Sequence, residues 1–150
     1  MCSSDLFPSH DTTENTLYEN NYYANLSTTE KSSFGGKYYY DPDNSSSYSY
    51  MPAMTGYMKN KDLLSSTTGT QTVSTYTIGF GSDTTSTAAV NLLTETATRG
   101  GGSFYSATDA TGLASALNSI LVNINQQQNS MVSVATTGSA SDKTQYLDLS

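Results

Sequence analysis

Hydrophobic residues are distributed unevenly along the 150-residue chain. Residues 1–49 hold most of the tyrosines and many Ser, Thr and Asn side chains but few aliphatic ones, so we expect them to supply little hydrophobic core. Within them, apolar positions over residues 17–26 have roughly helical spacing, and residues 34–37 form a candidate hairpin turn before Tyr38. We interpret residues 1–49 as a polar, Tyr/Ser/Asn-rich irregular segment or insertion.

Between residues 50 and 64 the apolar positions have helical spacing. Met51, Met54 and Met58 recur at intervals of three and four residues, and Pro52 is acceptable in the first turn of a helix. This pattern predicts a helix whose methionine stripe packs in the core rather than lining a binding groove, because flexible Met side chains fill irregular gaps between elements.

Two strands and an intervening helix are predicted over residues 73–106. Branched and aromatic residues dominate residues 73–81, which makes this segment the strongest predicted strand. Residues 82–86 can cap the following helix, and three glycines at positions 100–102 end it. Residues 103–106 predict a shorter strand. The buried face of the helix is expected to carry Ala89, Leu92, Leu93, Thr96 and Ala97.

A last helix is predicted after a cap at Thr108 or Asp109. Residues 126–129 end this helix, and residues 131–134 are a possible strand within a polar C-terminal segment, residues 127–150. The apolar stripe of the helix consists of Ala110, Leu113, Ala114, Leu117, Ile120, Leu121 and Ile124. In the parent fold, we expect Leu117 of this stripe and Ile78 of the stronger strand to be core residues.

From residue 50 to residue 126, predicted helices alternate with predicted strands, and their lengths are those of β-α-β crossover units. Such alternation favours parallel strands packed between helices. The sequence therefore predicts an α/β fold, a partial doubly wound (Rossmann-like) domain with late parallel strands and helices only. Two strands are too few for a finished sheet, so we expect residues 50–126 to be the C-terminal half of a larger domain.

Composition narrows the possible partners. The chain has 13 acidic and 6 basic residues, a net charge of -7 and a pI near 4.3. Nucleic acid and anionic lipid require clustered Lys and Arg, which are absent from the sequence. Ser and Thr are abundant, as in secreted and surface proteins. We expect no membrane span and no targeting signal within these residues, because no long apolar run occurs.

Candidate metal ligands are sparse. Cys2 and His10 are the single cysteine and histidine, and we interpret both as solvent-facing tail residues. Residues 41–45, DPDNS, resemble the start of a calcium loop, but Ser46 replaces the required Gly and Pro52 replaces the bidentate Glu. We interpret this segment as a polar turn.

Glycine-rich motifs do not match a nucleotide site in full. Gly79 and Gly81 follow a strand, but Thr84 stands where the dinucleotide fingerprint requires its third glycine. Residues 99–103, RGGGS, follow a helix, so the helix dipole has the wrong direction for binding phosphate. We interpret both motifs as turns.

Carboxylates in the predicted α/β part are Asp83, Glu95 and Asp109. We expect Asp109 to cap a helix and Glu95 to lie on an exposed helix face, and no nucleophile with an adjacent base is visible. The sequence therefore predicts no catalytic, cofactor-binding or metal-binding residues in this chain.

Several motifs in residues 50–135 occur in an order that is typical of one known family. They are residues 73–81 (VSTYTIGFG), Leu92, Leu93, Ala97, residues 100–105 (GGGSFY), Ala107, Asp109, Leu113, Ala116, Leu117 and Ile120. Together they resemble the closing half of a von Willebrand factor A domain, and most of all the domain of the PilC/PilY proteins of bacterial type IV pili. The resemblance implies a doubly wound sheet in a cell-surface protein of pilus assembly or adhesion.

The resemblance covers residues 50–135, and the Mg²⁺ motif of that superfamily, Asp-x-Ser-x-Ser, does not occur within them. The resemblance therefore carries no metal ligand over to these residues, and Mg²⁺ or Ca²⁺ is an expectation for the intact parent domain only.

The function expected from these observations is that of a non-enzymatic, extracellular or cell-surface module that binds pilus components or host surface proteins. One alternative is an A domain of another secreted or tight-adherence pilus protein. An alternative of a different class is a small Rossmann-type nucleotide-binding enzyme domain.

Overall fold

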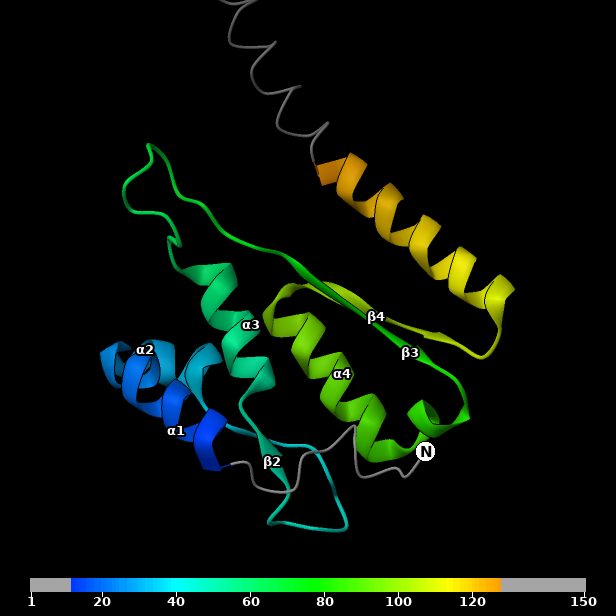
Figure 1. The fold of residues 1–150 in the computed structure, drawn as a ribbon, viewed down its shortest axis with the longest axis horizontal. Coiled ribbons are helices and arrows are strands. Elements are labelled where there is room, and N and C mark those ends of the chain that lie inside the picture. Colours follow the sequence, from blue (N-terminus) through cyan, green and yellow to red (C-terminus); the bar gives the residue numbers. More distant parts are fainter. Residues whose placement is uncertain (1–11, 128–150) are drawn as a thin grey trace, which may run out of the picture. The chain divides into compact units, whose positions relative to one another are not determined.

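The structure is a computed structural model that describes residues 12–127 (Figure 1). The described residues divide between residues 113 and 114 into two units, each of which is described by itself. Cys2, His10 and the possible strand at residues 131–134 lie outside the described residues. No helix among the described residues has both the length and the apolar character needed to cross a membrane.

Much of the segment of residues 12–49 forms regular secondary structure. The helical spacing seen in the sequence corresponds to α1 and the short turn after it, and Ser27 and Glu30 form a reciprocal capping box at the start of α2. The elements are α1 (Thr12–Asn21), the 3-10 helix η2 (Tyr23–Asn25), α2 (Thr28–Glu30), the π-helical turn η3 (Lys31–Gly35), and the strands β1 (Tyr38–Tyr39) and β2 (Tyr48–Ser49).

A hairpin forms here, but not with the predicted turn. Strands β1 and β2 pair antiparallel, with Tyr39 opposite Tyr48, and the chain reverses between them. Residues 34–37 are instead part of or adjacent to η3. The reversal occurs at the Asp/Asn segment because Asp41 and Asn44 accept hydrogen bonds from turn amides two residues ahead.

Helix α3 (Met51–Asn60) confirms the predicted helix up to Asn60. Its buried residues are Pro52, Ala53, Thr55 and Gly56. The expected methionine core is confirmed only in part, because Met54 is partly buried against the core while Met51 is 42% exposed. Small side chains occupy the interface because the helix is closely packed there. The Thr55 hydroxyl donates to the Thr96 carbonyl of α4 over 2.7 Å.

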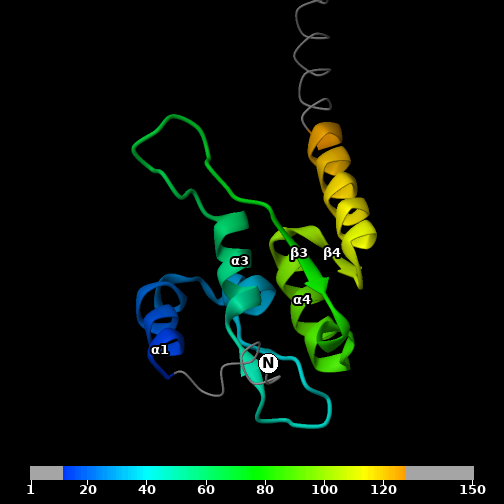
Figure 2. The ribbon, with the colours of Figure 1, turned by 45° about the vertical axis from the view of Figure 1, so that its right-hand side comes forward.

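Strands β3 (Thr75–Phe80) and β4 (Gly101–Ala107) are parallel and joined by α4 (Thr87–Arg99), as predicted. Helix α4 packs against both strands, and α3 packs against α4. Figures 1 and 2 both show α3, α4 and the strand pair side by side in that order. The fold is therefore mixed α/β, with a parallel two-stranded sheet beside helices.

Local signals place the ends of α4 where the sequence predicts them. The Ser86 hydroxyl accepts a hydrogen bond from the Ala89 amide at the N-terminus, and Gly100 is the C-cap. Gly101 has φ +70°, and a Cβ at Gly102 would overlap the Thr75 carbonyl. Glycines are thus needed where α4 turns directly into β4 beside β3.

Hydrophobic core in residues 12–50 comes from aromatic rings. Tyr18 is 2% and Tyr50 is 8% exposed, and both pack with Ala53 of α3. Leu26 and Phe34 are also buried. The expectation that this region supplies little core is wrong, because a tyrosine ring buries a large apolar area once its hydroxyl has a hydrogen-bond partner.

The helix of residues 110–127 begins at the predicted cap. The Gly112 amide donates to Asp109 Oδ1 over 2.8 Å. Leu117 is 49% exposed in this structure, and its place in the core of the parent fold stays a prediction. Ile78 on β3 is half-buried rather than fully buried.

Candidate functional site

The carboxylates singled out in the sequence do not converge. Glu95 Oε1 binds Arg99 Nε over 2.7 Å within α4, and Asp109 caps the helix of residues 110–127. Asp83 belongs to the 3-10 helix η4 (Ser82–Thr85). Two of these three residues thus have structural partners of their own.

The segment that resembles a calcium loop is a polar turn in the structure. Asp41 Oδ1 accepts from the Asp43 amide over 2.9 Å, and Asn44 Oδ1 accepts from the Ser46 amide over 3.1 Å. Among residues 12–127, no three His, Cys, Asp or Glu side chains are grouped so that they could hold a metal ion.

The two glycines at the end of β3 have different surroundings. A Cβ at Gly79 would lie 3.0 Å from Thr84 Oγ1 and 3.1 Å from the Phe104 ring. Gly81 has φ +92°, a backbone conformation that favours glycine, and a Cβ there would meet no other atom within 4 Å. The Thr84 hydroxyl donates to the Gly81 carbonyl over 2.9 Å.

Six tyrosines form a continuous series of ring contacts. We call it the tyrosine array: Tyr18, Tyr22, Tyr39, Tyr48, Tyr50 and Tyr57. Successive ring centroids are separated by 5.8 Å (Tyr39 to Tyr48), 6.1 Å (Tyr48 to Tyr50), 5.0 Å (Tyr50 to Tyr18), 6.0 Å (Tyr18 to Tyr22) and 5.0 Å (Tyr22 to Tyr57). These separations are those of direct aromatic contact.

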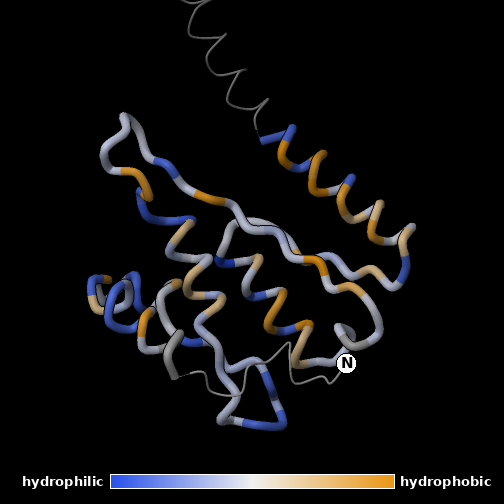
Figure 3. Tube along the Cα trace, in the orientation of Figure 1, coloured by the Kyte–Doolittle hydropathy of each residue, from blue (hydrophilic) through white to orange (hydrophobic). Residues whose placement is uncertain are grey.

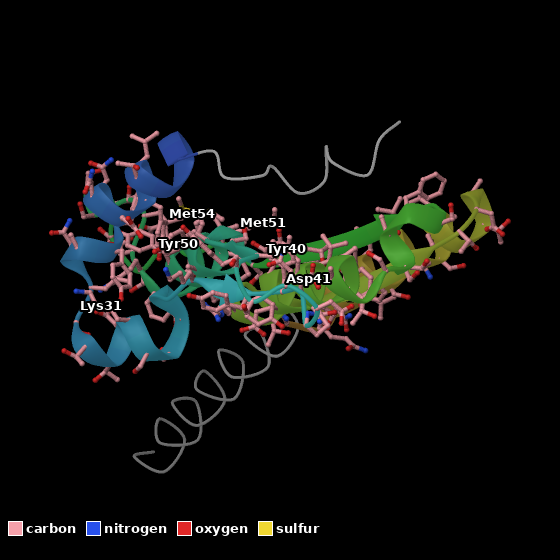
Figure 4. The ribbon with its side chains drawn as sticks, turned by 90° about the horizontal axis from the view of Figure 1, so that it is seen from below. Lys31, Tyr40, Asp41, Tyr50, Met51 and Met54 are labelled. Atoms are coloured by element: carbon pink, nitrogen blue, oxygen red, sulfur yellow. The ribbon has the colours of Figure 1, made fainter. Side chains whose placement is uncertain are left out.

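The array joins elements that are distant in the sequence. Tyr18 and Tyr22 belong to α1 and its end, Tyr39 and Tyr48 are opposite one another in the hairpin, and Tyr50 precedes α3. Figure 4 shows Tyr50 and Met54 on the side of α3 that faces α1, and Met54 packs against the same core.

Both buried phenols of the array donate hydrogen bonds. The Tyr18 hydroxyl donates to the Gly35 carbonyl over 3.1 Å, and the Tyr50 hydroxyl donates to the Glu19 carboxylate. Burial raises the pKa of Tyr18 to about 12, and burial together with the hydrogen bond to Glu19 raises the pKa of Tyr50 as well. Both phenols are therefore protonated at neutral pH.

Cationic side chains lie over tyrosine rings at the edge of the array. Lys37 Nζ is 4.4 Å from the Tyr48 centroid and 5.9 Å from the Tyr39 centroid. Lys31 Nζ is 4.9 Å from the ring of Tyr23. Because a ring face is electronegative, each contact is attractive and helps to order the rings near the surface.

Arg99, at the end of α4, connects the α/β part to residues 34–36 through hydrogen bonds. Its Nη1 donates to the carbonyls of Phe34 and Gly36 over 3.1 and 2.6 Å, while its Nε binds Glu95. A guanidinium can serve three acceptors at once because its donors are arranged as a planar fork.

A second charged contact is the ion pair of Glu30 and Lys61. It joins α2 to the residue after α3. The hydrogen bond from Lys61, assisted by Ser27, lowers the pKa of Glu30 to about 2. The Glu30 carboxylate is therefore ionised at neutral pH.

Sequence reasoning missed the tyrosine array. The spacing of Tyr18 and Tyr22 on a helical pattern was a signal for one part of it, but the pairing of Tyr39 with Tyr48 depends on a hairpin turn that the sequence places wrongly. The hydrogen bond from Tyr50 to Glu19 spans 31 positions and has no local signal.

Comparison with protein-family models, with curated proteins and with solved structures finds no match to this chain. The site must therefore be interpreted from its own geometry.

Proposed function

We propose that this chain is a non-enzymatic, extracellular protein-binding module, the closing part of a von Willebrand factor A-type domain from a bacterial type IV pilus protein of the PilC/PilY kind. The observation that supports it is the order of elements at the resembling residues. The strand with the sequence TYTIGF is β3, the helix with Leu92 is α4, the strand GGSFYSA is β4, and Asp109 opens the next helix.

The exposed hairpin supports a binding role. Tyr39 is 52% exposed and lies beside Lys37 and Tyr48, at the foot of a polar Asp/Asn/Ser turn. Tyrosines with neighbouring Ser and Asn are typical of protein-recognition surfaces, because they offer a large rigid contact area and adaptable hydrogen bonds. Pilus components or host surface proteins are the partners that we propose for this surface.

The alternative of a nucleotide-binding enzyme domain has less support. Thr84 fills the space beside Gly79, and the Ser86 hydroxyl already binds an amide at the start of α4. An A domain of another secreted or tight-adherence pilus protein would have the same fold and differs only in its partner.

The genomic sequence around this chain is the most direct test of the family. We expect an Asp-x-Ser-x-Ser motif after the first strand of the parent domain, which would also supply its Mg²⁺ or Ca²⁺ ligands, and neighbouring pilus genes. A complete glycine-rich fingerprint after a first strand, together with saturable binding of a nicotinamide or adenine nucleotide by the purified chain, would instead establish the enzyme alternative.

A binding measurement tests the surface role. The purified chain is mixed with purified type IV pili and sedimented. We expect the chain to pellet with pili, the variant Tyr39→Ser to lose this association, and Leu64→Ser to keep it, since Leu64 is 56% exposed but lies outside the hairpin. Equal loss in both variants, or no association of the unaltered chain, would contradict the proposal.

A further inference from the structure

The tyrosine array connects exposed rings through a buried centre. Tyr39 is 52% exposed at one end and Tyr22 is 37% exposed near the other, while Tyr18 and Tyr50 are buried between them. No step along the array separates ring centroids by more than 6.1 Å. Electron exchange between neighbouring rings therefore requires only transfers between side chains in contact.

The two buried phenols differ in what accepts their proton. Oxidation of a neutral tyrosine by one electron makes its hydroxyl strongly acidic, so a stable radical forms only where a base takes the proton. The Tyr18 hydroxyl donates to a backbone carbonyl, which is not a base at neutral pH. The Tyr50 hydroxyl donates to the carboxylate of Glu19, which can take the proton directly along the existing hydrogen bond.

We propose that the tyrosine array carries one-electron oxidation from exposed rings inward, and that the oxidising equivalent comes to rest on Tyr50 as a neutral tyrosyl radical. The oxidant is a one-electron oxidant derived from peroxide, which reaches the exposed phenols from solvent. The proposal is independent of the pilus assignment.

The step balances as follows. The oxidant takes one electron from an exposed ring, and each neighbouring ring in turn returns an electron outward until Tyr50 has lost one. The O–H bond of Tyr50 breaks, its proton forms an O–H bond with the Glu19 carboxylate, and the unpaired electron remains on the Tyr50 phenoxyl. The net products are a Tyr50 radical, a protonated Glu19 and the oxidant reduced by one electron.

Burial gives this radical a longer life than one at the surface. Tyr50 is 8% exposed, which limits its coupling with a radical on a second molecule, and the raised pKa of the phenol keeps it protonated and ready to react at neutral pH. Exposed Tyr39 would otherwise couple with other phenols. The array thus acts as a device that withdraws oxidation from the surface of the protein.

Flash oxidation of the purified full chain tests this proposal. Photogenerated tris(bipyridine)ruthenium(III) serves as the one-electron oxidant, and electron paramagnetic resonance after rapid freezing measures the yield and lifetime of tyrosyl radicals. The variants are Tyr50→Phe, which retains the ring but not the hydroxyl, and Glu19→Gln, which retains a hydrogen-bond acceptor but not the base. The matched control is Tyr105→Phe on β4, outside the array.

We expect a long-lived radical in the unaltered chain and in Tyr105→Phe, and its loss in both Tyr50→Phe and Glu19→Gln, with intermolecular dityrosine rising in those two variants. Circular dichroism confirms that each variant is folded, and Glu19→Gln changes a solvent-exposed residue and so preserves the test if Tyr50→Phe unfolds. An unchanged radical lifetime in folded Glu19→Gln, or the absence of a persistent radical in the unaltered chain, would overturn the proposal.

Discussion

Residues 12–50 and residues 51–107 build their cores from different side chains. The second region packs Ala89, Leu92 and Ala97 of α4, whereas the first packs the rings of Tyr18 and Tyr50. Figure 3 shows the same contrast in hydropathy, with hydrophobic positions recurring along α4 and a hydrophilic loop between β1 and β2. A segment with few aliphatic residues therefore folds when its phenols have hydrogen-bond partners.

The largest effect expected from this comparison follows truncation of a buried ring. Tyr18→Ala is expected to lower the free energy of unfolding by about 3 to 5 kcal/mol, as for other buried aromatic residues, and Leu92→Ala by about 2 to 5 kcal/mol. Urea denaturation measures both, with exposed Leu64→Ala as the control, expected to change stability by less than about 0.5 kcal/mol. If Tyr18→Ala lowers stability only slightly while Leu92→Ala lowers it strongly, residues 12–50 contribute little to the stability of the fold.

Substitution of Arg99 is expected to remove hydrogen bonds that connect residues 12–50 to α4. Arg99→Ala leaves the carbonyls of Phe34 and Gly36 without their charged donor, which should cost about 1.5 to 3 kcal/mol. The control Glu95→Ala removes only an i,i+4 pair, which is worth about 0.2 to 0.5 kcal/mol. If the two variants are equally stable in urea denaturation, the bonds from Arg99 to the carbonyls do not contribute.

A smaller effect is expected at the cap that follows β4. Asp109→Ala removes the acceptor for the Gly112 amide and should cost about 0.5 to 2 kcal/mol. Asp109→Asn retains an acceptor oxygen and is expected to restore most of that stability in thermal denaturation. If binding to pili is lost while stability is unchanged, Asp109 has a functional role that the cap does not explain.

The last expected effect is on the pH dependence of stability, at alkaline pH. Burial raises the pKa of Tyr18 from 10.0 to about 12, so its contribution is complete below pH 10 and is lost as pH rises through 12. Between these values the unfolded chain ionises this phenol while the folded chain does not. The melting temperature should therefore fall with pH more steeply in the unaltered protein than in Tyr18→Phe, and parallel slopes would show that the phenol is not buried.

The strands and helix of residues 73–107 were predictable because their signals are local. Branched residues mark β3, Ser86 and the glycines after Arg99 mark the ends of α4, and Asp109 marks the next cap. Each feature depends on residues that are only a few positions apart in the sequence, about one helical turn.

The sequence-based predictions that were wrong concern features that depend on contacts between residues distant in the sequence. The buried face of α3 is set by the close approach of α4 and of η3 and not by the spacing of its methionines, and Gly56 leaves room for the Phe34 ring of η3. The tyrosine core depends on hydrogen bonds from Tyr18 to Gly35 and from Tyr50 to Glu19, which hydropathy along the sequence does not express.

Native-state hydrogen exchange tests most directly whether residues 12–50 and residues 51–107 fold as one cooperative unit. The amides of Tyr22 and Lys31 donate to backbone carbonyls in the first region, and those of Thr75 and Gly81 do so beside β4 in the second. We predict that all four exchange with the opening free energy of global unfolding. Exchange of Tyr22 and Lys31 at nearly unprotected rates, while Thr75 and Gly81 remain protected, would contradict this account.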